Sequence, residues 1–185
     1  MLGKTKFLNT RYFSPVAIEG ITMAPKGSYE YITWYEEQRR RCYEGYTHGG
    51  VTITGNHYYY LNFWKIRAKG KDPGGSSTVR KGLFYPRFLD IDYEWFWEVE
   101  NARKAGEDLM ALKRRQGGYS YKIGCIGGYE FGFFPDSYTI IMAGEEKFAK
   151  KTFSDMKTGL NQLAGTAFYK NRMPNASDHI RAAYE

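Results

Sequence analysis

The sequence predicts an α/β protein: a partial parallel sheet with flanking helices, preceded by an N-terminal α+β segment that contains a β-hairpin. Three observations support this expectation. Apolar residues recur at helical spacing in residues 29–43, 88–106 and 145–164. Two short apolar runs, Leu109–Leu112 and Tyr138–Met142, have the length of buried strands. A glycine-containing turn separates the first run from a further helix, and this strand–turn–helix order is typical of α/β folds.

Length and composition narrow the class of protein. The 185 residues suit one domain with a small appended one, and no apolar run approaches the roughly 20 residues of a membrane span. The first ten residues lack the apolar region of a signal peptide, so membrane and secreted classes are disfavoured. Cys42 and Cys125 are not spaced like metal ligands, either with each other or with the scattered histidines. The sequence therefore predicts neither a disulfide scaffold nor a zinc site, and it favours a reducing compartment.

The charge and the aromatic content of the chain are compatible with a polyanionic binding partner. The formal net charge is +7 and aromatic residues make up 18% of the chain. A basic, aromatic-rich surface suits nucleic acid or nucleotide. Many small basic domains bind neither, so the charge by itself leaves both interpretations open.

The N-terminal region is expected to hold a helix and a hairpin. The helix covers residues 29–43, and the cluster Arg39–Arg41 near its end complements the helix dipole better than it indicates a phosphate site. Residues 45–66 predict a β-hairpin, with Tyr58–Phe63 as its second strand and Thr54–Asn56 as its turn. The tyrosines of that strand can stack on bases, but packing on both faces of a sheet is favoured.

Two further segments complete the frame around the central motif. Residues 67–80 are basic and rich in Gly, Ser and Pro, which predicts a solvated loop or linker that can touch DNA phosphates. Residues 88–106 predict a helix with Asp90 and Asp92 at its N-cap and Gly106 at its C-cap. Capping explains these carboxylates better than a metal or acid–base site does.

Residues 113–120, KRRQGGYS, carry the chemistry. Glycines in a strand–turn–helix layout let backbone N–H groups close around phosphates, and a hydroxyl at the helix start reaches a bound magnesium ion. The usual pattern is G-x-x-x-x-G-K-S/T. Gly118 and Ser120 match it, whereas Lys113 replaces the first glycine and Tyr119 replaces the lysine.

The segment resembles the deviant Walker A motif of large terminase subunits, the ATPases that package DNA into tailed-bacteriophage heads. In that family the loop commonly reads R-Q-x-G-K-S/T, which residues 115–120 match except at Tyr119. Some members carry G-Y-S or G-F-S and place a lysine at the start of the motif, where Lys113 lies. TGNHYYYLNFWKI at 54–66 is similar to a T-G-x-H-Y-x-Y-L-N stretch in terminases of crAss-like and related phages. The resemblance extends over residues 29–185 and is strongest from 51 to 145.

The resemblance implies a P-loop NTPase core of ASCE type, in the N-terminal part of a terminase subunit. Residues 1–80 would be an accessory region, and residues 81–185 the first half of the ATPase domain. ATP and Mg²⁺ are the implied cofactors. Ser120 would be the magnesium ligand, with Lys122 a weaker substitute for Lys113 as the phosphate lysine. The implied nucleotide-binding residues are Lys113, Arg115, Gln116, Gly117, Gly118, Tyr119 and Ser120, with Phe84, Tyr85 and Phe88 as candidates to hold the adenine.

The acidic half of an ATPase site is not expected in this chain. Glu145–Glu146 imitates a Walker B ending but follows Ser120 too closely, and no other apolar strand ends in Asp-Glu. We therefore expect no hydrolysis by this chain alone. In the full motor the resemblance implies duplex DNA, the portal protein and the small terminase subunit as partners, a homo-oligomeric ring, no membrane, and the host cytoplasm during virion assembly.

Two other functions stay open. A non-catalytic basic nucleic-acid-binding module explains the charge, the aromatic content and the basic segment 67–80. A phage structural or scaffold protein would bind neither nucleotide nor DNA. Nucleotide binding would distinguish the packaging motor from these two alternatives. Steeply salt-dependent DNA binding would distinguish the nucleic-acid-binding module from the structural or scaffold protein.

Overall fold

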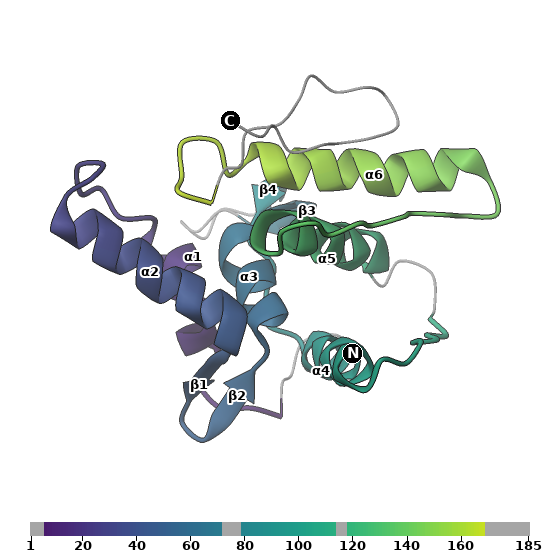
Figure 1. The fold of residues 1–185 in the computed structure, drawn as a ribbon, viewed down its shortest axis with the longest axis horizontal. Coiled ribbons are helices and arrows are strands. Elements are labelled where there is room, and N and C mark those ends of the chain that lie inside the picture. The colour runs from purple at the N-terminus through teal and green to yellow at the C-terminus, as the bar shows by residue number, and fades with distance from the viewer. Residues whose placement is uncertain (1–5, 72–78, 114–117, 169–185) are drawn as a thin grey trace. The chain divides into compact units, whose positions relative to one another are not determined.

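The computed structural model describes residues 6–71, 79–113 and 118–168 (Figure 1). It shows a mixture of helices and two small antiparallel sheets, each with two strands. The predicted parallel sheet is absent from these residues. In chain order the elements are η1 (Thr10–Phe13), α1 (Pro15–Glu19), α2 (Tyr29–Glu44), β1 (Tyr46–His48), β2 (Val51–Ile53), α3 (Gly55–Phe63), β3 (Ile66–Lys71), β4 (Val79–Phe84), α4 (Asp90–Ala105), α5 (Tyr119–Phe133) and α6 (Glu146–Asn161).

The chain divides into two units, and each is built from two separate segments. Residues 1–63 and 85–115 form the first unit, and residues 64–84 and 116–185 form the second. The units therefore interleave along the chain, whereas the sequence suggested one boundary near residue 80.

Helix α2 confirms the first predicted helix. Ser28 Oγ accepts a hydrogen bond from the N–H of Tyr31 at 3.2 Å, which satisfies one of the unpaired donors of the first turn. Within the last two turns, Arg40 and Arg41 both form ion pairs with Glu37. The arginine cluster thus lies at the helix end as expected, and two of its members bind a carboxylate of their own helix.

The prediction of a β-hairpin at residues 45–66 is confirmed for its first part and wrong for its second. Strands β1 and β2 do pair antiparallel, with Tyr46 opposite Ile53. Their turn is Gly49–Gly50, where both residues have positive φ, as a tight two-residue hairpin turn requires. The expected second strand, Tyr58–Phe63, is instead part of helix α3, and Thr54–Asn56 begins that helix rather than forming a turn.

Helix α3 is buried on every side. All nine of its residues are buried, and a helix is the conformation in which such a segment satisfies its own backbone groups. Thr54 Oγ1 accepts from the N–H of His57 at 3.2 Å and helps to start it. The preference of tyrosine for strands is weaker than these constraints. The expectation that the tyrosines pack, rather than stay available to bases, is confirmed by the burial of Tyr58, Tyr59 and Tyr60.

Asn62 joins α3 to the N-terminal turns of the first unit. Its Oδ1 accepts from the N–H of Val16 at 3.0 Å, and its Nδ2 donates to the carbonyls of Phe13 and Tyr58 at 2.8 and 3.0 Å. The side chain is fully buried, so these bonds replace water completely.

Helix α4 confirms the prediction for residues 88–106. Gly106 has the left-handed conformation expected of its C-cap, with φ of 68°. The N-cap is Leu89, not an aspartate. Asp90 and Asp92 lie in the first turn, where negative charge complements the helix dipole.

Residues 67–80 are not simply a loop, as the sequence suggested. Strands β3 and β4 form an antiparallel hairpin in which Ile66 is opposite Phe84 and Lys71 is opposite Val79. The rest of the expected loop, residues 72–78, lies outside the described residues. Backbone pairing between the two ends of the segment overrode its loop-like composition.

Helices α5 and α6 pack against each other in the second unit through small residues. A Cβ at Gly124 would touch the backbone of Met156, so the helix backbones approach closely. Trp64, fully buried, fills a slot between Gly128 of α5 and Gly159 of α6, where either residue would clash with the indole if it carried a Cβ. Helix α6 confirms the last predicted helix. Of its expected inward residues, Met156, Leu160 and Leu163 are buried, Phe153 is half-buried and Phe148 is exposed.

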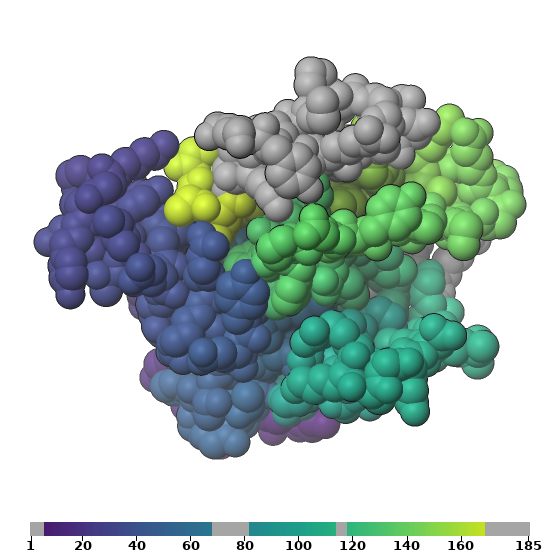
Figure 2. Space-filling model, viewed as in Figure 1, coloured from purple at the N-terminus to yellow at the C-terminus, as the bar shows by residue number. Residues whose placement is uncertain are grey.

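The two predicted core strands are not formed. Residues 107–113 and 137–143 have no regular secondary structure, and Met110, Leu112 and Tyr138 are 89%, 97% and 88% exposed. Figure 2 shows the green segment between α5 and α6 at the surface. A strand requires a partner for its backbone groups, and within the described residues only β1 with β2 and β3 with β4 pair.

Candidate functional site

The predicted phosphate-binding loop leads directly into helix α5. Gly118 has a left-handed conformation with φ of 71°, and the helix begins at the next residue, Tyr119. The Gly118 carbonyl accepts from the N–H groups of Tyr121 and Lys122 at 3.1 and 3.3 Å. Among the residues that the structure describes, no side chain makes a capping hydrogen bond at this end of the helix. The first turn therefore presents the positive end of the helix dipole and N–H groups that suit an anion.

The other predicted loop residues are distributed as follows. Ser120 lies half-buried in the first turn of α5. Lys113 is exposed at the end of the irregular segment 107–113, which belongs to the first unit, whereas Gly118, Tyr119 and Ser120 belong to the second. Arg115, Gln116 and Gly117 lie outside the described residues.

Lys122, the weaker candidate for a phosphate lysine, is 2% exposed. Its Nζ lies 4.2 Å from the centroid of the Tyr119 ring, which is within range of a cation–π interaction. The tyrosine that replaces the motif lysine thus contacts a lysine one turn further along the helix.

The three adenine candidates are divided between the two units. Phe84 ends β4 in the second unit, and its ring packs over Gly82. Tyr85 and Phe88 follow in the first unit, where burial raises the pKa of the Tyr85 phenol. The Phe88 ring lies 5.3 Å from the Phe13 ring, between centroids. Phe88 is therefore a packing residue of the first unit in this structure.

The residues present fit a phosphate group better than they define a complete metal site. An uncapped helix start after a left-handed glycine supplies backbone donors, and Ser120 supplies one hydroxyl ligand of the kind Mg²⁺ accepts. In the described part of the chain, no group of three or more His, Cys, Asp and Glu residues is placed to hold a metal ion.

Sequence reasoning missed a pocket in the first unit. It lies between α1 and α2, has a volume of about 480 Å³, and includes none of the predicted site residues. A periodic signal was present, because Glu30, Trp34, Glu37 and Arg41 recur at three- or four-residue spacing along one face of α2. Without the position of α1, this face could not be distinguished from an ordinary solvated one.

Comparison with known proteins identifies no relative. No protein-family model, curated protein or solved structure matches the chain. No helix of residues 6–71, 79–113 or 118–168 has the length and apolar character needed to cross a membrane.

Proposed function

We propose that the chain is the ATP-binding part of a viral DNA-packaging motor, a large terminase subunit that couples ATP hydrolysis to movement of duplex DNA into a procapsid. One observation carries the proposal: a left-handed glycine leads into an uncapped helix whose first turn holds Ser120. The motif resemblance at residues 113–120 and 54–66 supports the same function.

The order of segments around α5 adds support. An apolar segment without regular secondary structure precedes the loop, and another follows α5 and leads into α6. This is the order of a P-loop core, strand–loop–helix–strand–helix. A Cβ at Gly127 would meet the methyl group of Thr139, so Thr139 of the second segment lies beside α5.

Each loop residue then has a role set by its chemistry. Backbone N–H groups from Gly117 to Ser120 would donate to the phosphates, and the Ser120 hydroxyl would be a Mg²⁺ ligand. Lys113 supplies the positive charge that Tyr119 cannot, and Arg115 contacts phosphate or a neighbouring subunit. Bound Mg²⁺ would neutralise phosphate charge. Duplex DNA, portal protein and the small terminase subunit are the partners of the assembled ring.

Nucleotide titration tests the proposal. Calorimetry with ATP and Mg²⁺ is expected to show saturable binding, weakened about tenfold or more by Lys113→Ala and by Ser120→Ala. Lys26→Ala and Ser154→Ala are matched controls, because both residues are exposed and lie outside the loop. Absence of nucleotide binding, or equal losses in variants and controls, would refute the nucleotide site.

A second candidate function has its own observation. Residues 65–81 contain six Lys and Arg and one Asp, a net charge of +5 within a chain of +7. The β3–β4 register places Lys69 opposite Lys81, and β3 has cations at the alternate positions 67, 69 and 71. Phosphate binding requires a concentration of positive charge of this kind, so we infer that this hairpin is a candidate for DNA contact.

Salt dependence tests the second candidate. For binding to a duplex, the double variant Lys69→Gln/Lys81→Gln is expected to reduce the slope of log K against log salt by about two. The control pair Lys147→Gln/Lys157→Gln removes the same charge from α6. DNA binding without any nucleotide binding would favour the non-catalytic module over the motor.

A further inference from the structure

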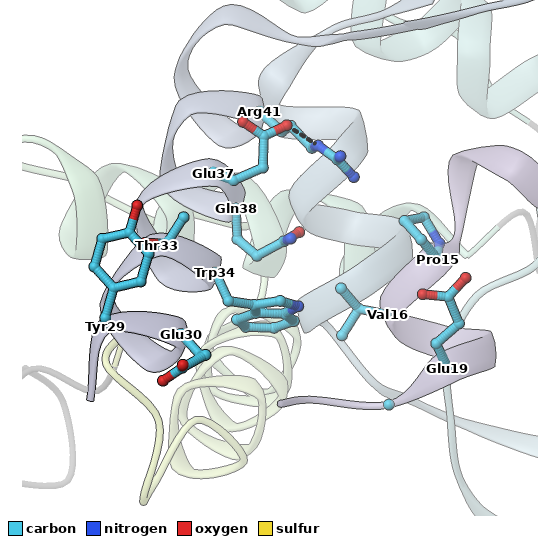
Figure 3. Close-up of a pocket in the computed structure, with 11 residues that line it drawn as sticks. Pro15, Val16, Glu19, Tyr29, Glu30, Thr33, Trp34, Glu37, Gln38 and Arg41 are labelled. Atoms are coloured by element: carbon cyan, nitrogen blue, oxygen red, sulfur yellow. Dashed lines mark hydrogen bonds and ion pairs between the residues drawn. The ribbon is translucent and has the colours of Figure 1, made fainter. Parts of the chain in front are cut away.

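The pocket between α1 and α2 differs in charge from the chain as a whole (Figure 3). Three glutamates line it, Glu19, Glu30 and Glu37, against one cation, Arg41. The protein carries a net charge of +7, so this is an acidic pocket on a basic molecule. A phosphate or other anion is disfavoured here, and a cation is favoured.

The three carboxylates are not equivalent. Glu37 is held by Arg40 and Arg41, whose nitrogens lie 2.9 and 2.6 Å from its oxygens. The side-chain carboxylates of Glu19 and Glu30 form no ion pair or hydrogen bond with any residue in the described part of the chain. Two acceptors in the lining are thus available to a ligand while the third is already neutralised.

An aromatic surface lies between the two available carboxylates. Trp34 is half-buried on α2, and Figure 3 shows its indole between Glu30 and the α1 wall that carries Val16 and Glu19. An indole face attracts a cation, and tryptophan does so more strongly than the other aromatic residues. An indole between two carboxylates suits a flat cation that can stack and donate hydrogen bonds sideways.

We propose that this pocket binds an arginine side chain presented by a protein partner. The guanidinium group is planar, stacks on aromatic rings and donates several N–H groups in one plane, whereas an ammonium group is a compact point charge. The volume of about 480 Å³ exceeds that of one side chain, which leaves room for neighbouring residues of a peptide. The site is separate from the proposed nucleotide loop and does not depend on it.

A peptide titration followed by NMR tests this proposal. The probes are capped Gly-Arg-Gly, Gly-Lys-Gly and Gly-citrulline-Gly peptides, and the readout is the indole N–H signal of Trp34, assigned with Trp34→Phe. The arginine peptide is expected to shift this signal saturably, with a dissociation constant in the millimolar range. We expect weaker binding of the lysine peptide and no saturable shift with citrulline, which keeps the shape but lacks the charge.

Variants separate the pocket from general electrostatic attraction. Glu30→Gln is expected to weaken arginine-peptide binding about fivefold, and Glu19→Gln by a similar factor. Glu36→Gln is the matched control, because Glu36 is exposed on the same helix and does not line the pocket. Circular dichroism checks that each variant folds. Equal shifts with arginine and citrulline, equal losses in Glu30→Gln and Glu36→Gln, or no saturable shift at all would overturn the proposal.

Discussion

The slot that holds Trp64 makes a sharp prediction about stability. Replacing Gly159 by alanine normally stabilises a helix by about 1 kcal/mol, because glycine is the more costly residue in a helix interior. Here the added methyl group would overlap the indole of Trp64, which is 0% exposed and also borders Gly128. The rigid ring has nowhere to move without disturbing both helices.

The magnitude follows from two opposing effects. Overpacking a filled core costs about 1–3 kcal/mol. Subtracting the helix preference leaves a net loss of up to about 2 kcal/mol for Gly159→Ala, where Gly→Ala on an open helix face gives a gain of about 1 kcal/mol. For a chain of this size a loss of about 2 kcal/mol corresponds to a fall in Tm of roughly 4–8 °C. Gly128→Ala is expected to behave similarly, because its Cβ would meet the same ring.

Thermal and urea unfolding, followed by circular dichroism and fluorescence, measure this effect. Two probes are needed because two units need not unfold together. Gly132→Ala is the control: it lies on α5, and a Cβ there meets nothing within 4 Å, so it should stabilise the protein. The destabilisation should also shrink in a Trp64→Phe background, where the smaller ring leaves space. If the Gly159→Ala variant were as stable as the Gly132→Ala variant, the close packing of Trp64 against Gly159 would be refuted.

Three further predictions concern the first unit. Asn62→Leu should lower the free energy of unfolding in urea by about 2–4 kcal/mol. The substitution removes three hydrogen bonds and leaves the Val16 N–H buried without an acceptor. A loss below about 0.5 kcal/mol would contradict this prediction. The hydrogen bond from Arg40 lowers the pKa of Glu37. The ionised carboxylate therefore stabilises the folded protein above the ordinary glutamate pKa of 4.5. This contribution is lost as the pH falls below that value and through the lowered pKa of the folded state. The stability difference between the wild type and Glu37→Gln should therefore narrow on acidification, and a difference that is constant with pH would exclude the effect. Burial raises the pKa of the Cys42 thiol, so Cys42 should react with a thiol reagent only after unfolding, and rapid labelling of the native protein would place it at the surface.

Helices with local signals were predictable from the sequence. The apolar period and Gly106 located α4, and the glycine turn located the start of α5 at Tyr119, one residue before the expected position. The spacing within residues 145–164 likewise located α6. These signals act over one or two turns, so a single segment contains all the information needed.

Elements that depend on distant partners were predicted less well. Tyr58–Phe63 has strand-type residues but is a helix, because burial on all sides requires a segment that satisfies its own backbone. The basic segment 67–80 has loop-type composition, yet its ends pair across a hairpin. The apolar runs at 109–112 and 138–142 have no regular secondary structure. Apolar character alone does not specify whether a neighbouring strand is present.

The candidate sites also differ in whether local sequence or tertiary packing reveals them. The phosphate site at residues 113–120 was predicted from the resemblance to a deviant Walker A motif, because the pattern itself departs from the usual motif at Lys113 and Tyr119. The sequence alone also determined the basic charge of the chain and four of its helices. Only the tertiary structure placed α1 beside Trp34 to create an acidic pocket, and Gly128 and Gly159 around Trp64. Those arrangements depend on close packing between segments far apart in sequence, and local patterns carry no information about which segments meet.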